Sequence, residues 1–87
     1  MKARAVPIKD DYLMRQLERL AQFVAAAIAK AAGLSKPAAL EEIHRAYREL
    51  FQIDPRFAHL VDPAALGDRA EEFLRLRRAE QALLAGR

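Results

Sequence analysis

The chain has 87 residues, a net charge of +3 and no cysteine, which excludes disulfide bonds and thiolate metal sites. A single domain of this length buries only ~60% of the surface of its unfolded chain, so we expect a thin core. Asp10, Asp11 and Arg15 interrupt any early apolar run, and no stretch reaches the ~20 apolar residues of a membrane span, so we expect a cytoplasmic protein outside the membrane.

Residues 1–9 show no hydrophobic periodicity, and Pro7 disfavours helix immediately before it. We therefore predict a flexible arm over residues 1–9.

The first predicted helix covers residues 10–33. Asp10 or Asp11 suits its N-cap, and Gly33 suits the left-handed position that ends a helix. Apolar residues recur at alternating steps of four and three, which indicates one continuous stripe. The stripe consists of Leu13, Leu17, Leu20, Val24, Ala27 or Ile28, and Ala31.

A second stripe on this helix contains only alanine: Ala21, Ala25, Ala29 and Ala32. Small residues at this spacing let another helix approach closely, but alanine also simply favours helix. Both interpretations stay open.

The start of the same helix carries a polar cluster of Asp11, Tyr12 and Arg15. We predict a structural corner, with the Tyr12 ring on the core and Arg15 bonded to a later carboxylate such as Asp54 or Asp62. A capped, solvated helix start is the plainer alternative.

The second predicted helix covers residues 36–53, with Ser35 or Lys36 as its cap and Pro37 in its first turn. Its apolar positions lie on one face. That face consists of Leu40, Ile43, Tyr47, Leu50 and Phe51.

Two Asp-Pro pairs follow, each suited to cap and open a helix. They predict a short helix over residues 55–60 and a last helix over residues 63–84, broken near Gly67. Arg77 and Glu80 interrupt the apolar stripe of the last helix. We therefore expect this helix to pack mainly through its N-terminal half and to project beyond the bundle. The whole pattern predicts an all-α fold: a helical hairpin, a short helical turn and a C-terminal helix in a small three- to four-helix bundle.

Two resemblances follow from particular segments. Residues 9–18, with an Asp-Tyr-x-x-Arg-x-Leu-Glu pattern, resemble the opening of a family of small, uncharacterised bacterial helical proteins. That resemblance implies a fold and no chemistry. Residues 41–55 are similar to the second helix and exit turn of a tetratricopeptide repeat, through Ala46, Tyr47 and the Asp54-Pro55 pair. The first helix departs from that repeat, so the resemblance implies a TPR-like hairpin without peptide-clamp residues.

Residue types that carry chemistry are sparse. His44 and His59 lie on different elements, Ser35 is the only serine, and the three glycines are isolated. Adjacent glutamates such as Glu41 and Glu42 diverge by about 100° on a helix and form no catalytic dyad. We therefore predict no catalytic, cofactor-binding or metal-ligating residues and no enzymatic activity.

The densest basic segment comprises Arg69, Arg75, Arg77 and Arg78, interleaved with glutamates. It is typical of a solvated helix face. A phosphate-binding stripe would need these cations on one face, and whether the Arg75–Arg78 segment binds anything stays open.

The leading hypothesis is a non-catalytic protein–protein interaction module that forms a homodimer, because the apolar face of the first helix exceeds what one partner helix covers. The predicted interface consists of Leu17, Leu20, Ala21, Val24, Ala25 and Ile28.

The alternative is a nucleic-acid- or ribosome-associated accessory protein. Residues 1–34 hold six basic side chains against three acidic ones, whereas the rest of the chain balances. The basic residues concerned are Lys2, Arg4, Lys9, Arg15 and Arg19.

Overall fold

The computed structural model describes residues 8–86, which form helices and connecting turns without any strand. The elements are α1 (Ile8–Ala32), α2 (Lys36–Phe51), the 3-10 helices η1 (Pro55–Leu60) and η2 (Pro63–Arg69), and α3 (Ala70–Leu84). The prediction of an all-α fold is confirmed. The predicted arm over residues 1–9 lies outside the described residues, except that its last two residues already belong to α1.

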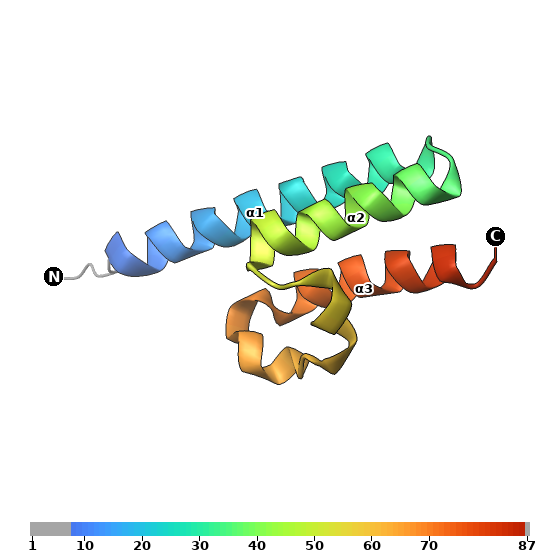
Figure 1. Cartoon of the computed structure of the whole chain (residues 1–87). Helices are drawn as coiled ribbons and strands as arrows, with labels where there is room; N and C mark the ends of the chain where they lie inside the picture. The colour runs from blue at the N-terminus through green and yellow to red at the C-terminus, as the bar shows by residue number, and fades with distance from the viewer. Residues whose placement is uncertain (1–7, 87) are drawn as a thin grey trace, which may run out of the picture.

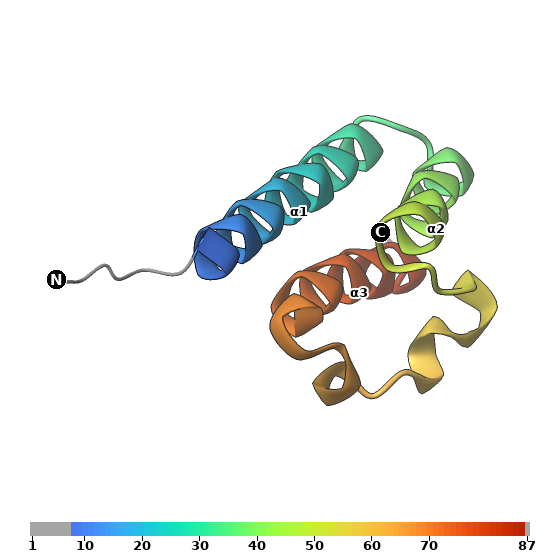
Figure 2. The same cartoon turned by 90° about the vertical axis from the view of Figure 1, so that its left-hand side faces the viewer.

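Helices α1 and α2 form the predicted hairpin, and α3 packs against both of them (Figure 1, Figure 2). The turn between α1 and α2 differs from expectation, because Gly33 does not have a positive φ. Its N–H instead bonds to the Lys30 carbonyl at 3.2 Å, and the Leu34 N–H bonds to Ala31 at 3.1 Å. These bonds tighten the last turn of α1 without a left-handed residue. Ser35 is the N-cap of α2, but its hydroxyl makes no capping hydrogen bond.

The left-handed residue lies at the end of α2. Gln52, with φ 55°, donates its N–H to Arg48, and the Ile53 N–H reaches the Tyr47 carbonyl at 3.1 Å. The bond from Gln52 to Arg48 is that of an αL C-terminal motif, and both bonds use carbonyls from the end of the helix. Helix α2 therefore stops at Phe51, before the predicted residue 53.

Both Asp-Pro pairs cap helices as predicted. The Asp54 carboxylate accepts the Arg56 N–H at 2.9 Å, and the Asp62 carboxylate accepts the Ala64 N–H at 3.0 Å. The Arg56 side chain also bonds to both Asp54 oxygens. These hydrogen bonds lower the pKa of Asp54 to about 2.

The predicted break near Gly67 is confirmed. Gly67 has φ 57° and ψ −125°, a conformation that side chains other than glycine rarely adopt, and it turns the chain from η2 into α3.

Gly67→Ala should therefore lower the free energy of unfolding by about 1–3 kcal/mol. The cost is purely conformational, since an added methyl group would meet nothing within 4 Å. Gly33→Ala is the matched control, because Gly33 lacks a positive φ and its new methyl group would lie 3.8 Å from the nearest atom, the Lys30 carbonyl oxygen. Urea unfolding of both variants checks this, and equal stabilities would contradict it.

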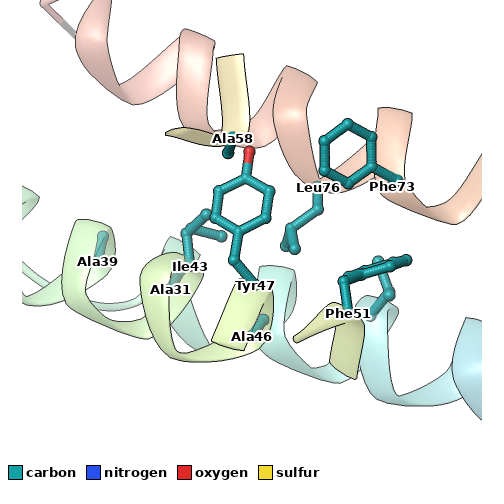
Figure 3. Packing of buried hydrophobic residues seen from close by; sticks show 10 residues of the cluster. Ala31, Ala39, Ile43, Ala46, Tyr47, Phe51, Ala58, Phe73 and Leu76 are labelled. Atoms are coloured by element: carbon teal, nitrogen blue, oxygen red, sulfur yellow. The ribbon is translucent and has the colours of Figure 1, made fainter. Parts of the chain in front are cut away.

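The core lies between the three long helices. Its largest fully buried side chains come from all of them: Tyr47, Phe73, Ile43, Leu76 and Val24. Figure 3 shows the first four of these side chains packed together. The Phe73 ring of α3 contacts two rings of α2, with centroid distances of 5.7 Å to Tyr47 and 5.6 Å to Phe51. These tilted and edge-on contacts are favourable geometries for aromatic pairs. They fix α3 against the hairpin.

The molecule is elongated, measuring 57 × 26 × 18 Å with a radius of gyration of 15.4 Å. A compact domain of this length would have a radius of gyration of about 12 Å. The long dimension follows α1, whose first turns extend past the end of the bundle (Figure 1).

Candidate protein interaction surface

The first turns of α1 have no neighbouring element. With a rise of 1.5 Å per residue, the 25 residues of α1 span about 37 Å and the 16 residues of α2 about 24 Å. Figures 1 and 2 show the surplus length at the N-terminal end of α1, beyond both α2 and α3. About two to three turns of α1 therefore stand clear of the bundle.

Large apolar side chains occupy these turns. Tyr12 is 60% exposed, Leu13 45% and Met14 57%, whereas Leu17 and Leu20 are half-buried. We call these five residues the projecting apolar surface. Leu13, Leu17 and Leu20 lie on one side of α1, and Tyr12 and Met14 lie about 100° to either side of Leu13. Exposed apolar residues that form a patch mark interaction sites more often than single exposed ones do.

The projecting apolar surface continues the stripe that packs inside the bundle. Leu13, Leu17, Leu20 and Val24 follow one another at helical spacing on the same side of α1. Along this line exposure falls from 45% at Leu13 to none at Val24, where α2 and α3 begin to cover the helix. The exposed part thus has the same character as the part that already binds two helices.

The bundle of the same chain covers part of the predicted interface. Val24 is fully buried in the core of its own chain and is not an interface residue, because the bundle covers this half of α1. Ile28 packs half-buried against the same core. Ala21 is half-buried and Ala25 is exposed.

The predicted corner does not form. Tyr12 is exposed, and Arg15 pairs at 3.3 Å with Asp11 of the same helix, at side-chain exposures of 75% and 59%. The carboxylates that were expected to bind Arg15 have other partners, since Asp54 binds Arg56 and Asp62 caps η2. The physical reason is the overhang of α1, which holds Arg15 away from every other element. The plainer alternative, a solvated helix start, describes this region.

A second feature lies beside the projecting apolar surface, where α1 and α2 leave a groove on their outer side. Phe23, 52% exposed, and the half-buried Leu50 line it. Two acidic side chains also line the groove. The Glu42 carboxylate lies 3.6 Å from Nζ of Lys30 and 3.7 Å from Nη1 of Arg45. The Glu49 carboxylate has no ion-pair partner among residues 11–86.

A polar cluster links α2 to α3. The buried Tyr47 hydroxyl donates to Glu80 Oε1 at 2.8 Å, and His44 Nε2 lies 3.1 Å from Glu80 Oε2. Burial, followed by the hydrogen bond to Glu80, raises the pKa of Tyr47 well above its usual range. His44 is half-buried in this cluster. In the sequence, the only sign of this cluster was that Glu80 interrupts the apolar stripe of the last helix.

Arg77, the other residue that breaks this stripe, also links elements. Its Nη2 donates to the carbonyls of Ala58 at 3.0 Å and Val61 at 2.7 Å, at the end of η1. Its guanidinium lies 4.8 Å from the centroid of the Phe73 ring. Arg77 therefore attaches η1 to α3.

The other arginines of the basic segment have different surroundings. Arg75 bonds to Glu72 at 2.8 Å, and Arg69 lies over the Phe51 ring at 5.8 Å. Arg78 is exposed. A phosphate-binding stripe receives no support from this arrangement.

Within residues 11–86, no group of three or more His, Cys, Asp or Glu side chains is placed to hold a metal ion. His59 is exposed on η1, far in sequence from the His44 cluster. None of the described helices combines the length and the apolar character needed to cross a bilayer.

Comparison with family models, curated proteins and solved structures gives no match to this chain. The resemblances to the bacterial helical family and to a tetratricopeptide repeat therefore stay predictions.

Proposed function

We propose that the protein is a self-associating helical interaction module that pairs with a second copy through the projecting apolar surface of α1. The observation that carries this proposal is the overhang of α1, which leaves Tyr12, Leu13 and Met14 without cover from their own chain.

A second copy fits this surface for three reasons. The side chains of Leu13, Met14, Leu17 and Leu20 carry no charge, so two copies can approach without repulsion. The surface extends a stripe that already packs against two helices of the same chain. Because α1 projects at one end of the elongated molecule, two copies can also pair antiparallel about a two-fold axis while their bundles stay apart.

In an antiparallel pair, the exposed first turns of the two α1 helices lie side by side, and the two helix dipoles oppose one another. Each copy offers only about two to three turns, so we expect the paired surface to lie near the lower limit of about 1,200 Å² for specific interfaces. We expect dissociation in the micromolar range for a contact between two short helical segments.

Light scattering coupled to size-exclusion chromatography tests the proposal. The wild-type chain should rise from 9.8 kDa toward twice that mass as its concentration increases through the micromolar range. Leu13→Glu places two charges in the symmetric interface and should raise the dissociation constant at least about 100-fold, since each buried leucine contributes about 1.5–3 kcal/mol.

The matched control is Leu34→Glu. Leu34 is 41% exposed, similar to Leu13, but lies at the opposite end of α1. This variant should dimerise like the wild type. A wild-type chain that keeps a mass of 9.8 kDa at several hundred micromolar would remove the proposal.

Nucleic-acid binding stays the alternative prediction, and no observation favours it. Arg15 is paired with Asp11. Arg19 is exposed, and the side chains of Lys2, Arg4 and Lys9 lie outside the described ones. Binding of DNA or RNA at low salt that weakens steeply as salt rises would support this alternative instead.

A further inference from the structure

Met14 combines an oxidisable sulfur with an exposed position on the projecting apolar surface. Its thioether is open to two-electron oxidation, and 57% of the residue is exposed to solvent. The chain contains no cysteine, so no thiol competes with its two methionines, Met1 and Met14, for an oxidant. Met14 is thus the side chain through which an oxidant can change the chemistry of this surface.

The position of Met14 makes its polarity important for pairing. Leu17 follows three residues later, and residues at this spacing are neighbours on the surface of a helix. Asp11 and Glu18, at three residues before and four residues after Met14, carry carboxylates that only accept hydrogen bonds when ionised. An oxygen added to the sulfur of Met14 would therefore find no donor in either acid and would depend on water.

Oxidation by a peroxide converts this apolar side chain into a polar one. The sulfur of Met14 donates an electron pair to one oxygen of hydrogen peroxide, the O–O bond breaks, and an S–O bond forms. The other oxygen leaves as water with both protons, so the sulfur is oxidised by two electrons and the peroxide is reduced. Pairing of two copies would then remove water from the sulfoxide oxygen, which opposes association.

We propose that Met14 is a site of reversible oxidation by peroxides, and that its sulfoxide weakens the pairing of two copies. This inference rests on the proposed self-association. The sulfur is exposed in a single copy, so the oxidant acts on the monomer that a weak dimer continually releases. Reduction of the sulfoxide restores the thioether and, with it, the apolar surface.

Hydrogen peroxide treatment of the full-length chain tests the inference. Peptide mass spectrometry gives the fraction of sulfoxide at Met14, and sedimentation equilibrium gives the dimer dissociation constant. Complete oxidation of Met14 should raise this constant at least about 10-fold, because both copies lose an apolar side chain from the contact. Methionine sulfoxide reductases should then return the constant to its original value.

Two substitutions serve as matched controls. Met14→Leu keeps the size and the apolar character, so it should dimerise within about threefold of the wild type. Its dissociation constant should not respond to peroxide, although Met1 can still be oxidised. Met14→Gln introduces a polar side chain of similar length and should be weak without any oxidant.

Urea unfolding shows whether the loss of pairing is a loss of the fold. Met14 is exposed, so at concentrations where the monomer predominates the oxidised and untreated chains should be equally stable. An oxidised chain that unfolds more easily as a monomer would overturn the inference, because the weaker dimer would then reflect a damaged fold.

The remaining outcomes separate this inference from the proposed function. A wild-type dimer whose dissociation constant is unchanged after complete oxidation of Met14 would overturn the inference and leave self-association intact. An equal response of the Met14→Leu variant to peroxide would also overturn it, because the effect would then arise elsewhere in the chain. A wild-type chain that is monomeric before oxidation would remove the proposed function, and this inference with it.

Discussion

Glu80→Ala is expected to lower the free energy of unfolding by about 3 kcal/mol, because it removes the acceptor of two side chains at once. Tyr47 has no solvent-exposed surface, and its hydroxyl bonds to Glu80. Figure 3 shows the Tyr47 side chain directed from α2 toward α3. His44 would lose its only described side-chain partner in the same variant.

A double-mutant cycle with Tyr47→Phe separates the hydrogen bond from the other effects of the substitution. Tyr47→Phe alone should cost about 1 kcal/mol, because it removes the buried donor together with its bond. In the Tyr47→Phe background, Glu80→Ala should cost clearly less than in the wild type. Glu71→Ala, an exposed glutamate of the same helix, should change stability by less than about 0.5 kcal/mol. Additive effects of the two cluster variants would contradict the proposed coupling.

Arg77→Ala should destabilise the fold by about 2–3 kcal/mol, since it leaves the carbonyls of Ala58 and Val61 without their charged donor and uncovers one face of Phe73. Arg77→Lys keeps the charge but cannot reproduce the guanidinium over the ring, so it should recover only part of this loss.

The adjacent Arg78→Ala is the control for charge and helix propensity, because Arg78 is exposed. Urea unfolding followed by circular dichroism gives the free energies. Hydrogen exchange should show that the Arg77→Ala variant loses additional protection in η1, because Arg77 binds carbonyls at the end of η1. Equal stabilities of the Arg77→Ala and Arg78→Ala variants would contradict this role.

Local signals in the sequence identified most of the helical elements. The Asp-Pro pairs predicted the start of η1 and η2, and Gly67 predicted the break before α3. These signals succeed because each depends on one or two residues and their own backbone. Gly33 and Gln52 show the limit, since the left-handed position fell on a glutamine that no propensity would select.

Long-range contacts could not be predicted in the same way. Glu80 and Arg77 looked like simple interruptions of an apolar stripe, yet they bind residues that lie 33 and 19 positions away in the sequence. The burial of Val24, a residue of the predicted interface, could not be predicted for a similar reason. The stripe of α1 reads identically at Leu13 and Val24, and only the shorter length of α2 decides which part the bundle covers.

Intermolecular contacts between labelled and unlabelled copies test the central claim most directly. In an isotope-filtered NOE experiment on a mixed sample at several hundred micromolar, the account predicts intermolecular contacts from the methyl groups of Leu13, Met14 and Leu17. It predicts none from Leu60, although that residue is 70% exposed on η1. Intermolecular contacts at Leu60 with none along the first turns of α1, or no such contacts anywhere, would contradict it.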